Sequence, residues 1–355
     1  MDNLISTVTR HDRPDLAINA DLACRLETNM DTNHPPVSVI IPCFNQGRYL
    51  GCALESVISQ GFPRIEIVVV DDGSTDDTRR IAEKYQGVKY VYQVNQGPSS
   101  ARNTGIKNSS GDFLVFLDAD DWLLPEAIMT NLSYLRQNAE LAFVSGSHKR
   151  VFTENGRTQN SIREIESDHY YHLLHSNYIG MPASAMFRRR VFDEFLYDTA
   201  LSVCEEYDLC LRIARKFPVR HHTKVIAAYR IHGPSQSSDP FLMLTTILSV
   251  LGRQKKFLRT QREVQALKNG KRNMKAYYYP KMYEELNSKI KVFGKTNVVE
   301  MLFAYPRLIS LKYLFLQPLF LKGIKLFIRQ NAPELVLRGL HKVGLYENFV
   351  PAAKR

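Results

Sequence analysis

A regular alternation of short apolar strands and helical patterns runs from residue 37 to residue 117. Strands that are apolar almost throughout are typical of a parallel sheet covered by helices on both faces. The predicted order is strand 37–41, helix 47–60, strand 65–70, helix 78–86, strand 88–94, helix 98–109 and strand 113–117. The pattern therefore predicts an α/β fold with a mostly parallel central sheet.

Polar segments follow three of these strands, and two of the segments are rich in acids. They read PCFNQ at 42–46, DDGSTDD at 71–77 and DADD at 118–121. Ligands of parallel α/β sheets bind at the carboxyl ends of the strands, so a site is expected there. The G-x-G-x-x-G pattern of dinucleotide-binding proteins is missing after the first strand, and no P-loop pattern occurs. Acids at this edge suit a ligand whose phosphates arrive with a divalent cation.

Charge is divided unevenly along the chain, which has 355 residues and a formal net charge of +11. Residues 251–355 hold 22 Lys and Arg against 6 Asp and Glu, whereas residues 1–250 hold 25 against 30. The apolar stretches at 240–252 and 313–321 are too short to span a bilayer, which takes about twenty residues. We expect a basic, helical C-terminal region that does not cross a membrane.

The compartment is predicted from the cysteines and from the first residues. The five cysteines have neither the density nor the paired spacing of a disulfide or zinc framework. The start of the chain lacks a basic segment followed by an apolar one, so no secretory signal is expected. We expect a cytoplasmic protein. Its basic tail mixes Lys and Arg with Leu, Phe and Tyr, which suits peripheral contact with anionic lipid at the inner face of the plasma membrane. A solvated helical bundle and a nucleic-acid-binding tail are the alternatives for the tail.

Five motifs in order resemble those of glycosyltransferase family 2. They are VSVIIPCFNQGRYL, IEIVVVDDGSTDDT, NQGPSSARNTGI, FLVFLDADDWLLPE and CEEYDLCLRIARKFPVR followed by AYRIHG, and they span residues 37–235. The resemblance implies the GT-A fold and a metal-dependent, inverting transfer from a nucleotide sugar. It also implies a polar arm at 1–35, a catalytic domain at 36–235 and the basic region at 236–355. Within the catalytic domain, 36–121 would bind the nucleotide and 122–235 the acceptor.

The resemblance assigns the nucleotide to residues of the first three motifs. Pro42 and Phe44 would lie along the base, although both also suit a strand end. Asp72 would accept the imide N–H of uracil, and its alternative role is to cap a turn. Arg102 would be the charge partner of the diphosphate, since a guanidinium offers fixed donors to phosphate oxygens. A surface salt bridge is the alternative for Arg102.

The segment DAD resembles the DXD motif of the family. By this resemblance Asp118 would reach the ribose, and Asp120 would bind Mn²⁺ or Mg²⁺ between the two phosphates. Residues two apart on extended backbone point to the same side, so both carboxylates would face one ligand. Asp121 is then expected to point away and to cap a helix that opens at 123–126. His232, in YRIHG, resembles a histidine that some family members place on the same metal.

The acceptor side of the family carries an acidic pair followed by an aromatic residue, and this chain reads CEEYD at 204–208. Glu206 occupies the position of the catalytic base, where Asp is commoner. Either carboxylate can act as a general base if it lies within hydrogen-bond reach of the acceptor. Two alternatives stay open: Asp208 is the base, or the acids form a solvated helix start that the helix dipole favours.

These assignments predict a hexosyl- or N-acetylhexosaminyltransferase that adds one sugar from a nucleotide diphosphate sugar, with UDP as the expected nucleotide. The acceptor is expected to be a glycan or lipid-linked glycan of bacterial surface polysaccharide synthesis. Processive members carry Q-x-x-R-W, which this chain cannot have because Trp122 is its only tryptophan. The alternative is an inactive nucleotide-sugar-binding or assembly protein whose basic tail binds membrane or nucleic acid.

Overall fold

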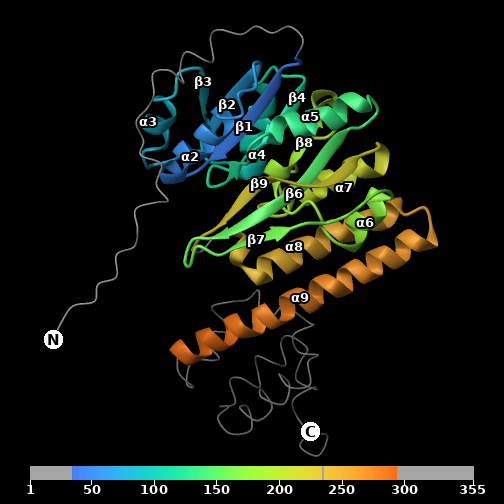
Figure 1. Ribbon diagram of the computed structural model, residues 1–355. Helices are drawn as coiled ribbons and strands as arrows, with labels where there is room; N and C mark the ends of the chain where they lie inside the picture. The colour runs from blue at the N-terminus through green and yellow to red at the C-terminus, as the bar shows by residue number, and fades with distance from the viewer. Residues whose placement is uncertain (1–33, 234–235, 294–355) are drawn as a thin grey trace, which may run out of the picture. The chain divides into compact units, whose positions relative to one another are not determined.

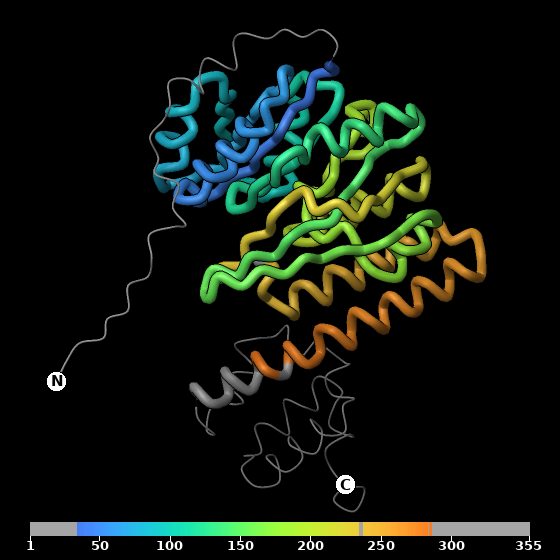
Figure 2. Tube along the Cα trace, in the orientation of Figure 1, coloured from blue at the N-terminus to red at the C-terminus, as the bar shows by residue number. Residues whose placement is uncertain are grey.

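The computed structural model describes residues 34–233 and 236–293 of this chain. The chain divides into two compact units, Met1–Pro234 and Ser235–Arg355 (Figures 1 and 2). Nearly all of the predicted arm at 1–35 lies outside the described residues, as does the apolar stretch at 313–321. The predicted domain limits therefore stay predictions.

The first unit is built on one mixed sheet, whose order in the described residues is β3-β2-β1-β4-β8-β6-β9-β5, with β7 paired to β6. Strands β3, β2, β1 and β4 are parallel. Strand β8 then runs antiparallel between β4 and β6, β9 is parallel to β6, and β5 is antiparallel to β9. The strands are β1 Val37–Cys43, β2 Ile65–Asp71, β3 Val88–Tyr92, β4 Phe113–Phe116, β5 Trp122–Leu123, β6 Phe143–Phe152, β7 Thr158–Ser161, β8 Ala185–Arg188 and β9 Arg220–Ile231.

Helices connect these strands and cover the sheet (Figure 1). In the first unit they are α2 Gly47–Ile58, α3 Thr78–Ala82, α4 Pro98–Lys107, α5 Ala127–Gln137, α6 His169–His175 and α7 Glu205–Lys216, with 3₁₀ turns η1 Pro182–Ser184 and η2 Arg189–Asp193. Helix α4 packs on β1 and β2. A Cβ atom at Gly105 would lie 2.2 Å from Cγ2 of Ile40, so the missing side chain allows this close approach.

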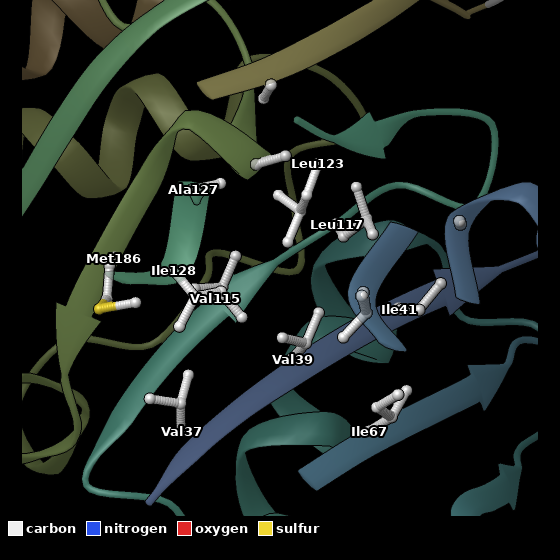
Figure 3. Close-up of a cluster of buried hydrophobic side chains, with 14 of the residues drawn as sticks. Val37, Val39, Ile41, Ile67, Val115, Leu117, Leu123, Ala127, Ile128 and Met186 are labelled. Atoms are coloured by element: carbon white, nitrogen blue, oxygen red, sulfur yellow. The ribbon is translucent and has the colours of Figure 1, made fainter. Parts of the chain in front are cut away.

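The main core lies beside the parallel strands (Figure 3). Alternate residues of β1, Val37, Val39 and Ile41, are fully buried and meet Val115 of β4 and Ile128 of α5 in one cluster. Burying a side chain of this size stabilises the fold by about 1.5–3 kcal/mol. The core therefore fixes the positions of the strand ends where the predicted site residues lie.

The helix predicted to open at 123–126 begins later in the structure. Residues Trp122 and Leu123 form β5 and pair with Ala228 and Ala227 of β9, and α5 starts at Ala127. The prediction was wrong because the apolar segment after the acids finds a partner strand that lies more than 100 residues further along the chain.

The second unit contains a helical hairpin in its described residues. Its elements are η3 Gln236–Ser238, α8 Pro240–Arg253, η4 Gln254–Phe257 and α9 Gln261–Phe293. Asp239 caps α8, because its carboxylate accepts the backbone N–H groups of Phe241 and Leu242. Phe241 and Leu244 of α8 pack with Met282 of α9. Within the described residues, no helix has both the length and the apolar composition that crossing a bilayer requires.

Candidate active site

Asp72 lies at the carboxyl end of β2, and its carboxylate is buried. One oxygen, Oδ1, accepts Nε2 of Gln93 at 2.6 Å and the backbone N–H of Gln96 at 2.9 Å. The other, Oδ2, accepts the backbone N–H of Gly97 at 2.8 Å. The carboxylate therefore does hold the turn before α4, which was the alternative role considered for it. Oδ1 has two donors and Oδ2 has one, so Oδ2 keeps an acceptor position for a ligand.

Phe44 follows β1 and leaves 48% of its surface exposed, although it is a large apolar residue. Asn45 has a φ of 52°, and its side-chain oxygen accepts the backbone N–H of Thr75. This bond joins the loop after β1 to the loop after β2. The ring of Phe44 is therefore exposed on a loop joined to the one that follows Asp72, and its predicted contact with a base stays a prediction. Pro42 is half-buried within β1.

Arg102 of α4 lies in the interior, with 3% of its side chain exposed. Nη1 lies 2.6 Å from Oε1 of Glu205, and Nη2 lies 2.7 Å from Oδ1 of Asp118 and 2.9 Å from Oε1 of Glu206. These four residues are called the Arg102 cluster below. The alternative of a surface salt bridge is wrong, because the side chains of Arg102 and Glu205 are buried and those of Asp118 and Glu206 are only partly exposed. The predicted phosphate contact stays a prediction, and the two terminal nitrogens of the guanidinium are here engaged by carboxylates.

The acids of DADD lie on a turn rather than on extended backbone. The backbone N–H of Asp121 donates to the carbonyl of Asp118 and closes the turn. Asp118 and Asp120 remain 29% and 23% exposed, whereas Asp121 is buried. The pKa of Asp118 is raised, first by burial and then by the charges of Asp120 and Glu205, against the opposing charge of Arg102. Asp118 and Asp120 thus both reach solvent from this turn of residues 118–121, called the acidic turn below, but the extended backbone expected for them was wrong.

Asp121 has a different role from the predicted helix cap. Its Oδ1 accepts the backbone N–H of Arg230 at 2.9 Å, and Nε of Arg230 donates to the carbonyl of Asp120 at 2.7 Å. The Arg230 guanidinium lies over the rings of Trp122 and Tyr49, at 4.6 and 4.9 Å from their centroids. The end of β9 is therefore fastened to the acidic turn. Arg230 lies within the motif AYRIHG, two residues before His232. This position in the motif was the only indication in the sequence that Arg230 belongs to the site.

His232 and Asp120 come together as the sequence predicted. Nε2 of His232 lies 2.8 Å from Oδ2 of Asp120, and Tyr49 packs against the imidazole at 4.8 Å between ring centroids. A carboxylate oxygen and an imidazole nitrogen suit Mn²⁺ and also Mg²⁺, although Mg²⁺ prefers oxygen. No group of three or more possible metal ligands occurs in the part of the chain that the structure describes. The pair therefore fits a cation that takes its other ligands from a bound diphosphate and water.

Three acids occupy the first turn of α7, and their surroundings differ. Glu206 has 25% of its side chain exposed, against 6% for Glu205 and 2% for Asp208. Asp208 is paired with Arg212 at 2.7 Å on the same helix. The pKa of Glu206 is raised well above its usual range, first by burial and then by Glu205, while Arg102 opposes the shift. Of the three, Glu206 is the carboxyl group that a solvent-borne substrate reaches most easily.

The fold and this set of acids can be compared with known proteins. The sequence model of glycosyl transferase family 2 matches residues 38–196. This part of the chain belongs to glycosyltransferase family 2. An uncharacterized glycosyltransferase of Rickettsia conorii is 31% identical over 227 residues, which cover 61% of this chain and 37% of the relative. The chondroitin synthase of Escherichia coli is 27% identical over 62% of this chain and 34% of its own length. The chain thus spans about a third of the length of these family relatives.

Solved structures support the same fold. Residues 1–349 of Staphylococcus aureus TarS in complex with UDP-GlcNAc match with a TM-score of 0.56 at 21% identity, over 88% of this chain and 89% of that one. The mannosyltransferase PcManGT of Pyrobaculum calidifontis, in complex with GDP-Man and Mn²⁺, matches with a TM-score of 0.53 at 16% identity, over 82% and 87%. The fold of this chain is similar to that of GT-A glycosyltransferases, as predicted.

Proposed function

We propose that this protein is an inverting, metal-dependent glycosyltransferase. In this proposal it moves one hexosyl or N-acetylhexosaminyl group from a UDP-sugar to a glycan or lipid-linked glycan acceptor in bacterial surface polysaccharide synthesis. The observation that carries the proposal is the Arg102 cluster. One guanidinium lies 2.7 Å from Asp118, on the acidic turn, and 2.9 Å from Glu206, on the first turn of α7. A donor held at the acidic turn would therefore lie beside a carboxylate on the acceptor side.

The hydrogen bonds of Asp72 support a uracil base. Uracil offers one imide N–H, whereas guanine offers an N–H and an adjacent amino group that together suit both oxygens of a carboxylate. Oδ1 of Asp72 already accepts two donors, and Oδ2 accepts one. The remaining acceptor position suits a single N–H, and the exposed ring of Phe44 would pack on the base. UDP is also the nucleotide of the TarS complex named above.

Asp120 and His232 would hold the divalent cation, Mn²⁺ or Mg²⁺. When bound, the cation would supply positive charge against the charge that develops on the diphosphate leaving group. Arg230 supports this arrangement, since its bonds to Asp120 and Asp121 keep the acidic turn beside the residues that precede His232. The protein's own part is thus to hold the two ligands at one place before the donor arrives.

Glu206 would accept the proton of the acceptor hydroxyl. The oxygen would attack the anomeric carbon from the face opposite the nucleotide, the bond to the diphosphate would break, and the configuration would invert. Asp208 is a weaker candidate for the base, since it is buried and bonded to Arg212. Glu206 is more exposed and lies on the same guanidinium as Asp118.

The second unit supports peripheral contact with anionic membrane. From Arg253 to Lys281 the chain holds ten basic residues and one acid, Glu263. The basic residues are Arg253, Lys255, Lys256, Arg259, Arg262, Lys268, Lys271, Arg272, Lys275 and Lys281, and they are exposed or half-exposed. The pKa of Lys271 is lowered by burial and by the charges of Lys255 and Lys275. An anionic surface would relieve this repulsion, and a membrane position would suit a lipid-linked acceptor.

The experiment that tests the proposed function is a donor screen. Thermal stabilisation of the protein would be measured with Mn²⁺ and UDP-, GDP- and dTDP-sugars, together with the release of free nucleotide. We expect a UDP-sugar to stabilise the protein and to release UDP when an acceptor is added. Stabilisation without release under every acceptor condition would favour the inactive binding or assembly protein.

A further inference from the structure

The Arg102 cluster joins segments that lie far apart in the sequence. Arg102 comes from α4, Asp118 follows β4, and Glu205 and Glu206 open α7, 103 residues after the arginine in the case of Glu205. Each of the two terminal nitrogens of the guanidinium has a carboxylate partner, while Nε is buried and has no partner. No nitrogen of Arg102 is directed at open solvent in this arrangement.

One guanidinium is therefore the cationic partner of three carboxyl groups in a largely buried site. Burial and the neighbouring carboxylate of Glu205 raise the pKa of Glu206, and Arg102 is the group that opposes this rise. An opposite charge within about 4–6 Å typically lowers a carboxyl pKa by about 1–3 units. Without the charge of Arg102, Glu206 would stay protonated up to a higher pH. In that pH range it could not accept a proton from the acceptor.

The frame around the cluster does not depend on the charge of Arg102. Asn103 donates to the carbonyl of Tyr197 and accepts its backbone N–H, at 2.9 and 3.0 Å. Ser99 donates to the carbonyl of Leu201 at 3.1 Å. These three bonds hold the segment before α7 against α4. We therefore expect this segment to stay in place when Arg102 is changed.

We propose that Arg102 is a positioning residue of the transfer reaction, which binds the carboxylates of Asp118 and Glu206 together and holds Glu206 in place for the acceptor. This inference rests on the proposed function, in which Glu206 is the base. It replaces the expected phosphate contact of Arg102 with a contact to the base. The hydroxyl proton still passes to Glu206, and Arg102 takes no part in bond breaking.

The test is the pH–rate profile of turnover at saturating donor for Arg102→Met and Arg102→Lys. With Arg102→Met, we expect the acidic limb of the profile to move about one pH unit or more toward higher pH, because the opposing charge is lost. Arg102→Lys keeps the charge and should move the limb less. The affinity for UDP with Mn²⁺, measured by calorimetry, should change by less than about threefold in both variants.

Glu205→Gln should shift the acidic limb in the opposite direction and provides a second, independent test. It removes a negative charge beside Glu206, so the acidic limb should move toward lower pH. Arg212→Gln is the matched control, since it removes the arginine that pairs with Asp208, another acid of the first turn of α7, and should leave the limb in place. Circular dichroism and thermal unfolding would identify any variant that does not fold, and the remaining variants then decide the result.

Three outcomes would overturn the inference. The first is an acidic limb that does not move in Arg102→Met, together with UDP binding that is at least tenfold weaker. This result would assign Arg102 to nucleotide binding. The second is a shift of the same sign in Arg102→Met and Glu205→Gln, which would indicate a general structural effect. The third is a shifted limb in Arg212→Gln, which would point to Asp208. Failure of the proposed function is distinguishable, because the parent would then release no nucleotide in the donor screen, whereas failure of the base assignment alone would leave Glu206→Gln with the parent's rate.

Discussion

Nε2 of His232 lies 2.8 Å from a carboxylate oxygen of Asp120, a residue 112 positions earlier in the chain. The contact joins the end of β9 to the turn that follows β4. Arg230 secures it from the same strand, through the backbone of Asp120 and the carboxylate of Asp121. Two ligand types that transition metals accept are thus held at one edge of the sheet.

Asp120→Asn tests this pair as a cation site. The amide removes the negative charge while it keeps the shape, so Mn²⁺-dependent binding of a UDP-sugar should weaken by about 100-fold or more. His232→Gln should weaken it less, because one ligand of the pair keeps its charge. Calorimetry with and without Mn²⁺ measures both effects. Equal donor affinity in Asp120→Asn and the parent would exclude Asp120 as a metal ligand.

Gln93 is expected to set the preference for the nucleotide base. Gln93→Leu removes the side-chain donor to Oδ1 of Asp72 and frees an acceptor position on that oxygen. The freed position can accept a second donor of guanine, so GDP should bind roughly fivefold more tightly, for about 1 kcal/mol of added hydrogen bond, and the preference for UDP over GDP should narrow. Gln96→Leu is the control, because Gln96 reaches Asp72 only through its backbone N–H. A UDP to GDP ratio that stays at the parent's value in Gln93→Leu would argue against this assignment.

Three buried histidines should make the first unit sensitive to acid. Burial lowers the pKa of His148, His221 and His222 to about 4, from 6.5. A lowered pKa means that the unfolded chain takes up protons first, so stability is full above pH 6.5 and is lost as the pH falls toward 4. Each histidine adds a slope of up to about 1.4 kcal/mol per pH unit. Denaturant unfolding at pH 7.5, 6 and 5 measures it, and His222→Gln should reduce the slope. A slope near zero in the parent would contradict the burial of these rings.

The proposed membrane contact of the basic residues in the second unit is tested with charge reversal. Lys255→Glu, Lys256→Glu and Arg259→Glu together should abolish sedimentation with vesicles that contain anionic lipid, at about 1 kcal/mol per removed charge and more for reversal. Lys84→Glu, Lys107→Glu and Lys224→Glu change the net charge equally on the first unit and should leave binding in place. Binding to duplex DNA with none to anionic vesicles would identify nucleic acid as the partner.

Local sequence was enough to predict the parallel half of the sheet and the acids at its strand ends. Apolar runs mark strands β1, β2 and β4, and acids follow β2 and β4. The antiparallel half could not be ordered in this way. Strand β8 lies between β4 and β6 because of pairings across long sequence separations, and the two residues of β5 carry no pattern of their own.

The partners of the predicted site residues also could not be predicted from the sequence. Arg102 was expected at a phosphate because its motif resembles the family segment that passes over the diphosphate. Its carboxylate partners lie on other elements. Gln93 and Arg230 were missed for the same reason. Glutamine and arginine are common residues in loops and strands. Only the folded chain brings Gln93 to Asp72 and Arg230 to Asp120.

Turnover of Glu206→Gln is the measurement that tests the account most directly. The variant keeps the size of the side chain and removes its charge, so UDP and Mn²⁺ binding should stay within about threefold of the parent. Turnover should fall by a factor on the order of 10² to 10⁴, the usual contribution of a positioned base. Asp208→Asn should reduce turnover less, and Glu206→Asp should keep part of the activity.

The pH–rate profile completes this measurement. Because the pKa of Glu206 is raised above the ordinary 4.5, the parent should show an acidic limb above that pH, and Glu206→Gln should lose the limb. Sugar transfer by Glu206→Gln at the parent's rate, with the acidic limb intact, would contradict the account.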